Sequence, residues 1–319
     1  MRFDIQFFGG GSWDEDKFSR YAASKGRSFD AVTKMSTGQN MFVERRLHES
    51  LNPYNVIREC CDSEEHPNTV PVILALDVTG SMGAACKMTA KALGAIMSDL
   101  YKNHKDIEFM MMAIGDLVYD DAPIQASQFE SDTRIAEAID NIYFEAGGGG
   151  NQYESYTAAW YFGLKHTRLD CWKRGKKGII ITMGDEPLNP YLPKHKLSKA
   201  LGDSLQDDVE TNALYEEALT KFHIFHIGVE DPHDCFRDYR EKIEASFGKL
   251  LGDHYKVSNL NMLPSVITKC IDESIASQSG PSTIGGPDVY IPPVVDAGAN
   301  TEDGIGETQI NPDTGAIRW

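Results

Sequence analysis

The sequence lacks several features that would place the protein in other classes. Its six cysteines are scattered over 319 residues, without the density of a disulfide framework or the CxxC spacing of a metal knuckle. No apolar run is long enough to span a bilayer, and the first residues lack the small-residue cleavage site of a secretory signal. We therefore expect a cytoplasmic protein with no membrane partner.

Positive charge is also scarce. Lysine and arginine total 31 against 48 acidic residues, which gives a formal net charge of -17. Such a chain would be repelled by DNA or RNA phosphates, so we expect no nucleic-acid partner. A hydrophobic content of 41% is enough to bury a substantial core. A bound cation or a cationic partner fits this composition better than a nucleic acid.

Short β-rich runs alternate with amphipathic stretches from about residue 69 onward. The strongest strand candidates are VPVILALD, IEFMMMAIG, GIIITMGD and FHIFHIGV, with weaker ones at DAPIQ and HYKV. Apolar residues recur at helical spacing in the stretches 84–103, 132–142, 156–164, 236–247 and 263–271. This pattern predicts an α/β fold with a doubly wound, mostly parallel six-stranded sheet and helices on both faces.

Composition divides the chain into three predicted parts. Residues 1–67 are rich in Gly, Ser and mixed charge and look like an N-terminal extension, while residues 68–276 form the α/β domain. Residues 277–319 are rich in Gly, Pro and acid, with Arg318 as their only base. We expect this tail to be mobile when free, because it buries too little to offset its ordering entropy. The alternative is that YIPPVV or AIRW docks as an extended segment.

The stretch VILALDVTGSMGAA ends a buried-type strand in oxygen-bearing side chains. Asp77, Thr79 and Ser81 alternate along a turn that Gly80 and Gly83 are expected to tighten. Open α/β sheets bind ligands at the carboxyl ends of their strands. Hard oxygen donors favour Mg²⁺, Mn²⁺ or Ca²⁺ over zinc. The simpler interpretation of Ser81 alone is a helix cap, whose oxygen accepts from N–H groups of the first turn.

This DxTxS run resembles the DxSxS signature of von Willebrand factor A-type (vWA) domains, in which three loops build a metal-ion-dependent adhesion site. The resemblance covers roughly residues 68–276. It implies that Asp77, Thr79 and Ser81 are the ligands of the first loop. It also implies that Asp185, directly after the strand-like GIIITMG, is the acid of the third loop.

The second loop departs from the common family pattern. EAGGGGNQYESY has no Thr directly after its glycines and is more similar to a variant with three glycines, an Asp and a downstream Glu. That variant places Asn151 at the polar position and Glu154 at the acid, and Ser155 is a further candidate. An ion held directly by one carboxylate keeps positive charge and can accept a partner's carboxylate. Direct coordination by Glu154 would make the site a poorer acceptor.

The resemblance implies a divalent-metal-dependent protein-binding module, an adaptor or scaffold and not an enzyme. Bacterial and phage members are often paired with AAA+ ATPases, which implies that class of partner, and an acidic ligand would complete the metal site. The opening MRFDIQFFGGG is similar to openings of phage-encoded proteins. A carboxylate from the tail of another copy would give metal-dependent self-association.

The same residues also support an alternative enzyme. LDVTGSM resembles the DxTGT run of haloacid-dehalogenase-type phosphatases, in which Asp77 would be the Mg²⁺-supported nucleophile and Lys177 the phosphate anchor. Soluble members of that superfamily place a second acid two residues after the nucleophile, where this chain has Thr79. Further acids are expected beyond Asp185, where Asn189 and prolines follow. These departures favour the binding module.

Two other polar groups are expected to play structural parts. His223 and His226 are three apart in one strand, so they point to opposite faces and cannot chelate one ion together. The basic cluster at 173–177 is expected to be a solvated loop, with a contact point as the alternative.

Overall fold

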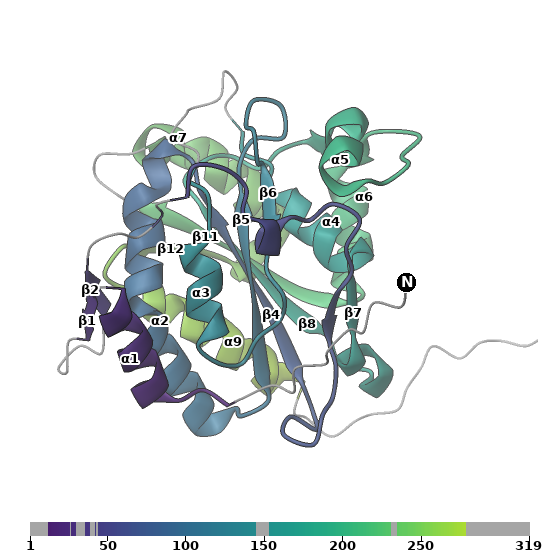
Figure 1. Cartoon of the computed structure of the whole chain (residues 1–319). Coiled ribbons are helices and arrows are strands. Elements are labelled where there is room, and N and C mark those ends of the chain that lie inside the picture. Colours follow the sequence, from purple (N-terminus) through teal and green to yellow (C-terminus); the bar gives the residue numbers. More distant parts are fainter. Residues whose placement is uncertain are drawn as a thin grey trace, which may run out of the picture. The chain divides into compact units, whose positions relative to one another are not determined.

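A six-stranded sheet forms the centre of the computed structural model, which describes residues 12–25, 27–29, 36–38, 42, 44–144, 153–230 and 235–278. The strand order is β12-β11-β8-β4-β5-β6 (Figure 1). All neighbours are parallel except β6, which is antiparallel to β5. The strands are β4 (Val70–Asp77), β5 (Ile107–Ile114), β6 (Ile124–Ala126), β8 (Gly178–Gly184), β11 (Phe222–Glu230) and β12 (Tyr255–Asn259). The predicted fold class and all six predicted strands are confirmed.

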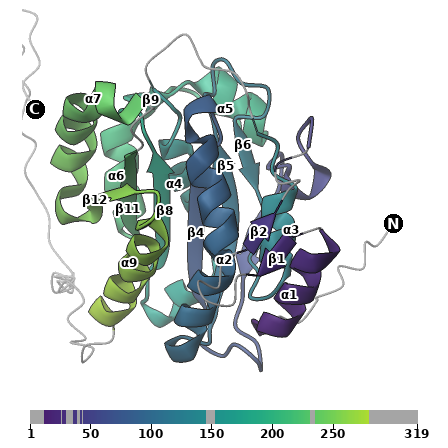
Figure 2. The ribbon, with the colours of Figure 1, turned by 90° about the vertical axis from the view of Figure 1, so that its left-hand side faces the viewer.

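Helices cover both faces of this sheet. Side chains of α1, α2, α3 and α9 share one apolar core, and those of α4, α5, α6 and α7 share the other. Figure 2 shows α2 and α9 together on the near face. The helices are α1 (Glu15–Ser24), α2 (Gly83–Asn103), α3 (Arg134–Asp140), α4 (Thr157–Lys165), α5 (Lys194–Leu201), α6 (Thr211–Leu219), α7 (Cys235–Ile243), α8 (Lys249–Leu251) and α9 (Leu263–Ser277). The five predicted helical stretches are confirmed, whereas α1, α5, α6 and the short α8 were not located from the sequence.

The central strand β4 shows why its sequence is apolar without alternation. Val72, Leu74 and Leu76 pack in the core beneath α2 and α9, while Ile73 and Ala75 pack in the core beneath α4. Successive side chains of a strand point to opposite faces, so a strand covered on both sides is apolar at every position. The core therefore fixes β4 rigidly, up to the residue where it ends.

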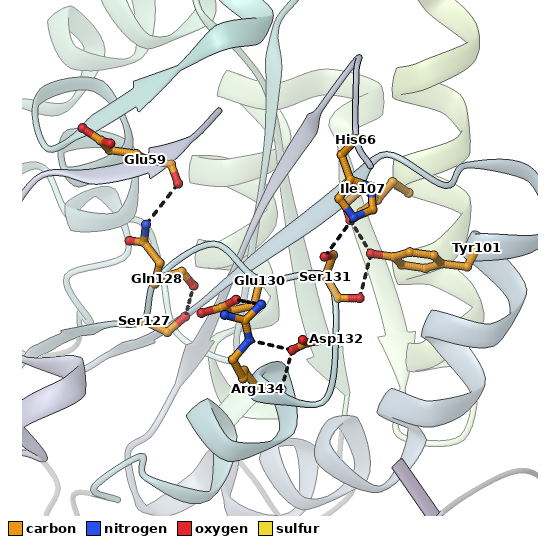
Figure 3. A network of polar contacts seen from close by, with 10 residues as sticks. All are labelled: Glu59, His66, Tyr101, Ile107, Ser127, Gln128, Glu130, Ser131, Asp132 and Arg134. Carbon is orange, nitrogen blue, oxygen red and sulfur yellow. Dashed lines mark hydrogen bonds and ion pairs between the residues drawn. The ribbon is translucent and has the colours of Figure 1, made fainter. Parts of the chain in front are cut away.

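Segments before β4 pack against the same domain. The strand β3 (Arg58–Cys60) pairs in parallel with β7 (Thr167–Leu169), and Trp13 Nε1 donates to Ser98 Oγ at 3.3 Å. Figure 3 shows Gln128 donating to the carbonyl of Glu59 at 3.2 Å and His66 close to Ser131. Two further small sheets pair β1 (Arg27–Phe29) with β2 (Ser36–Gly38) and β9 (Tyr191–Leu192) with β10 (Val209–Glu210).

The chain divides into two units, Met1–Gly280 and Pro281–Trp319. The second unit lies outside the described residues, as do YIPPVV and AIRW, so the docking of the tail stays a prediction. The predicted division at 67 and 276 likewise stays a prediction. Within the described residues, no helix is long and apolar enough to cross a membrane.

The order of the strands creates a switch point at the centre of the sheet. The chain runs outward from β4 through β5 to β6 on one side, then returns to β8 and runs outward through β11 to β12 on the other. Loops leaving the carboxyl ends of β4 and β8 therefore diverge, which opens the crevice where α/β sheets bind ligands. Asp77 ends β4 and Asp185 directly follows β8, so both lie at this point.

Candidate functional site

Asp77, the acid of the first loop, has no exposed surface. Its Oδ1 accepts from the backbone N–H of Thr79 at 2.9 Å and from the Thr79 hydroxyl at 2.6 Å. Its Oδ2 accepts from the hydroxyl of Tyr156 at 2.6 Å. Burial raises the pKa of Asp77, and these hydrogen bonds, which favour the charged form, only partly offset it. The carboxylate is thus buried and held in one orientation.

Thr79 and Ser81 lie in the turn that leads from β4 to α2. Thr79 is buried and precedes a 3-10 turn at Gly80–Met82, while Ser81 is half-buried within that turn. The N-cap positions are Thr79 for the turn and Met82 for α2, and neither start has a side-chain cap hydrogen bond. The interpretation of Ser81 as a helix cap is therefore wrong.

The glycines of this turn act differently from the prediction. Gly83 has a right-handed φ of -56°, so its backbone does not require glycine. Gly80 does not require glycine for its backbone either, because the described glycines with positive φ are Gly175, Gly202 and Gly252. What Gly83 provides is space, because a Cβ there would lie 3.3 Å from the ring of Phe144.

The acids predicted from the later loops come to the same end of the sheet. Asp185 is fully buried directly after β8, and Glu154, 3% exposed, forms a parallel bridge with Leu188 in the loop after Asp185. After burial itself, the charges of Asp77, Asp185 and Glu154 are the main causes that raise the pKa of Tyr156. Acids from three loops therefore lie in the neighbourhood of Tyr156, and Asp77 contacts its hydroxyl directly.

The remaining candidates of the glycine-rich loop differ in what the structure shows of them. Asn151 lies outside the described residues, so its part as a ligand stays a prediction. Ser155 serves the loop itself: its Oγ accepts from the N–H of Leu117 at 3.0 Å, and its own N–H donates to the carbonyl of Gly115 at 3.2 Å. These bonds tie the start of α4 to the loop after β5.

Sequence reasoning missed Tyr156, which it assigned only to a helix face. The ring is 1% exposed, and the hydroxyl reaches Asp77 across the end of β8 because Gly184 has no side chain. A Cβ at Gly184 would lie 2.1 Å from that hydroxyl. The signal in the sequence is the glycine directly before Asp185, where a residue with a side chain would block the contact.

Sequence reasoning also missed three acids beside the site, namely Glu186, Asp116 and Asp120. Glu154 has its pKa raised to about 11 by burial and by the charges of Asp77, Glu186, Asp120 and Asp116. Burial and the same neighbourhood raise the pKa of Glu186 to about 7. Asp116 and Asp120 follow β5 at the carboxyl end of the sheet, which was the available signal.

The residues present suit a divalent cation of the hard type. Oε2 of Glu154 is buried without a hydrogen-bond partner in the described structure, and the main causes that set the pKa of Asp77 and of Glu154 include no lysine or arginine. Among the described residues, no three His, Cys, Asp or Glu side chains are grouped closely enough to hold an ion by themselves. A fitting donor set therefore includes the hydroxyls of Thr79 and Ser81, with water, in addition to carboxylates.

The alternative phosphatase is not supported by this arrangement. Lys177, its phosphate anchor, directly precedes β8, whereas Asp185 follows the other end of that strand, roughly 25 Å away. The Lys177 ammonium donates to the carbonyl of Leu219 at 2.5 Å instead. Asn189 is 4% exposed and exchanges hydrogen bonds with Thr157, at 2.6 and 3.2 Å, so it joins two loops.

The histidine pair also follows the packing interpretation. His226 is fully buried, stacks on Phe247 with ring centroids 3.5 Å apart, and lies 2.9 Å from the hydroxyl of Thr182. Burial lowers the pKa of His226 to about 3. His223 is half-buried, near His254. The prediction that the two do not chelate together is consistent with these separate surroundings.

No protein-family model and no curated protein sequence matches this chain. Among solved structures, the pilus adhesin SpaC from Lactobacillus rhamnosus GG in an open conformation is similar, with TM-score 0.43 and 11% identity over 66% of this chain. The match spans only 30% of the SpaC chain. The vWF domain of the type V pili tip protein Mfa5 from Porphyromonas gingivalis gives TM-score 0.42 and 10% identity, over 66% of this chain and 96% of that one. The fold class stated above rests on the strand order and not on these similarities.

Proposed function

We propose that the chain is a protein-binding module whose ligand contact depends on a divalent cation. Asp77, Thr79 and Ser81 hold the ion, and Asp185 contributes directly or through a water. Mg²⁺ is the proposed ion, with Mn²⁺ and Ca²⁺ as alternatives of the same hard type. The observation that carries the proposal is the convergence of buried acids from three loops, beside which the pKa of Glu154 is raised to about 11. A divalent cation is the simplest charge that offsets this repulsion.

The geometry around Asp77 suits this role. Thr79 Oγ1 uses its proton on Asp77, which leaves the oxygen lone pairs for a cation. The Tyr156 hydroxyl fixes the second oxygen of Asp77 and limits its rotation. When bound, the ion would supply positive charge that attracts an incoming carboxylate, while this chain's side chains set the position of the ion.

Glu154 decides how much positive charge the bound ion keeps. Without an ion, burial and the charges of neighbouring acids raise the pKa of Glu154 and favour its neutral form, whereas a bound cation favours the charged form. If Glu154 stays neutral, the ion is held by Asp77 and by neutral hydroxyls, with Asp185 bound through a water. Such an ion keeps positive charge and accepts a partner's carboxylate. If Glu154 ionises and coordinates directly, the site becomes a poorer acceptor. Asn151 is the alternative ligand from the same loop.

The partner that fits this site is a protein that offers an acidic side chain. An AAA+ ATPase is the class implied by the resemblance to bacterial and phage vWA domains, and a cytoplasmic adaptor or scaffold role follows from it. A carboxylate from residues 281–319 of another copy is the alternative ligand and would give self-association. No catalytic step is needed in this function.

Titration calorimetry with Mg²⁺ and with Mn²⁺ tests the site. We expect one ion per chain in the wild type and no measurable binding in Asp77→Ala. Asp99→Ala is the matched control, because Asp99 is an exposed acid of α2 that pairs with Lys102. Equal binding by wild type and Asp77→Ala would overturn the metal site.

The binding function is tested separately. An immobilised chain is compared in Mg²⁺ and in EDTA, and we expect captured partners that are lost both in EDTA and in Asp77→Ala. Light scattering of the full chain and of a chain ending at Gly280, which keeps Gln278 and its contacts, separates self-association from a foreign partner. Capture that is unchanged by EDTA would contradict metal dependence, even if the ion itself binds.

A further inference from the structure

A small cavity lies at the end of the sheet opposite to the metal site. Its volume is about 230 Å³, and its lining includes Val70 at the start of β4, the end of α9 at Ile275, and the turn before β8. Because Val70 and Asp77 are the two ends of one strand, the cavity and the metal site are separated by the length of β4. The cavity is therefore a distinct feature that the proposed function does not use.

Three cationic side chains line this cavity, namely Arg174, Lys176 and Lys177. They belong to the basic cluster that the sequence predicted to be a solvated loop. The structure corrects that prediction, because Lys176 and Lys177 are half-buried and line a hollow. A cationic hollow is unexpected in a chain whose formal net charge is -17.

The two lysines keep most of their hydrogen-bonding capacity. Lys176 Nζ donates to the backbone carbonyl of Gln278, and Lys177 Nζ donates to that of Leu219 at 2.5 Å. An ammonium group has three donors, so each has two left. No carboxylate in the described ranges forms an ion pair with either group, whereas Arg174 is already paired with Asp62. In the described structure, two adjacent lysines therefore line the cavity without a paired carboxylate.

The lining of the cavity also includes apolar side chains. Val70 and Ile275 contribute aliphatic surface, and Cys171 contributes a buried thiol. The volume is below the 300–1,000 Å³ that is common for drug-sized ligands, so the cavity suits a small molecule and not a folded partner. Two ammonium groups beside apolar side chains match a dianion that carries a short aliphatic group.

We propose that this cavity binds a small phosphate monoester. The phosphate lies between Lys176 and Lys177, with Arg174 behind them, and the short organic group packs on Val70 and Ile275. Phosphate is favoured over a single carboxylate because its second charge is matched by the second ammonium group. The site acts independently of the divalent cation at the other end of β4.

Calorimetric titration of the full chain with propyl phosphate, inorganic phosphate and butyrate tests this proposal. We expect propyl phosphate to bind more tightly than inorganic phosphate, which lacks the apolar group, and more tightly than butyrate, which carries one charge. The affinity should fall as salt is added, because the attraction is between charges. The titrations are made in EDTA and repeated in Mg²⁺, and the same result is expected in both.

Paired variants locate the binding. Lys176→Gln and the double variant Lys176→Gln/Lys177→Gln should weaken propyl phosphate binding by about tenfold or more, since hydrogen bonds to charged groups are lost. Lys173→Gln is the matched control, because Lys173 belongs to the same basic cluster but is exposed and pairs with Asp170. The thermal unfolding midpoint of each variant shows whether it is folded. If the double variant does not fold, the single variant Lys176→Gln still provides the test.

Two outcomes would overturn the proposal. One is that propyl phosphate produces no saturable heat with the wild type. The other is that the folded Lys176→Gln variant binds it as tightly as Lys173→Gln does. Either result leaves the metal site untouched, because none of these variants changes Asp77 and the titrations in EDTA do not depend on the ion.

Discussion

The hydroxyl of Tyr156 donates a hydrogen bond of 2.6 Å to Oδ2 of Asp77, although the two residues are 79 positions apart in the chain. Both side chains are almost completely buried. The bond joins the end of β4 to the start of α4 over Gly184, where a Cβ would meet the hydroxyl at 2.1 Å. The orientation of the proposed first metal ligand thus depends on a residue from another loop.

Removal of the Tyr156 hydroxyl should loosen Asp77 without emptying the core. We expect Tyr156→Phe to weaken Mg²⁺ binding about tenfold, since groups that orient a ligand commonly contribute that much. Tyr161→Phe is the control, because its hydroxyl bonds Asp203, outside the site. Calorimetry measures both. Unchanged Mg²⁺ affinity in Tyr156→Phe would show that the bond does not position the ligand.

Gly184→Ala should destabilise the fold, because the new methyl group overlaps the Tyr156 ring. We expect a loss of about 1–3 kcal/mol in the free energy of unfolding, as for other overpacked cores. Gly248→Ala is the control, since a Cβ there would make an ordinary contact of 3.5 Å with the ring of Tyr255.

Chemical unfolding measures these free energies. Tyr156→Leu combined with Gly184→Ala should lose less stability than the sum of the two single changes, because the smaller side chain relieves the overlap. Strict additivity of the two changes would contradict the overlap.

Thr79 should contribute its hydroxyl and not its methyl group. We expect Thr79→Ser to keep Mg²⁺ binding within about threefold, and Thr79→Val to lose about tenfold or more, because a hydrogen bond and an oxygen ligand disappear together. Valine has nearly the size of threonine, whereas serine keeps the hydroxyl and lacks only the methyl group. Equal Mg²⁺ affinity in the two would remove Thr79 from the ligand set.

The protein should not hydrolyse phosphate esters. Thr79 occupies the position of the acid/base, and Lys177 lies at the far end of β8 from Asp185. An assay with an aryl phosphate and Mg²⁺ should show no turnover above that of Asp77→Asn. Turnover that disappears in Asp77→Asn would favour the phosphatase instead.

Glu130 should make stability depend on pH. Its carboxylate lies 2.8 Å from Arg134 (Figure 3), yet burial, which outweighs the charge of Arg134, raises its pKa to about 7 together with the charges of nearby acids. The folded state therefore holds this proton more tightly than the unfolded state does. The contribution of protonated Glu130 to the free energy of unfolding is fully present below its unfolded-state pKa of about 4.5. This contribution is lost as the pH rises through its folded-state pKa of about 7.

Glu130→Gln removes this dependence. Relative to wild type, the variant should gain stability between about pH 5 and about pH 8, with a rise of about 2 °C or more in the difference of unfolding midpoints. Glu241→Gln changes an exposed acid of α7 and is the control for a simple change of net charge. A difference that stays constant over this range would show that Glu130 is ionised in both states.

The fold was predictable because its signals are local. Each strand buried on both faces is a continuous apolar run, and each long helix shows its own apolar spacing, as in β4 and α9. The candidate ligands Asp77 and Asp185 were predictable for the same reason, since each directly follows the apolar part of a central strand. Short or polar helices such as α5 were missed because two buried leucines, Leu197 and Leu201, give little periodic signal.

The sequence by itself determined the α/β class, the strands and the residues that carry oxygen at their carboxyl ends, because those patterns depend only on neighbours along the chain. Only the tertiary structure decided that Tyr156 bonds Asp77, that Glu154 is buried among other acids, and that the basic turn lines a cavity. Burial and contact depend on which strands pair and which loops meet. Those pairings join residues far apart in the chain, so no local pattern records them.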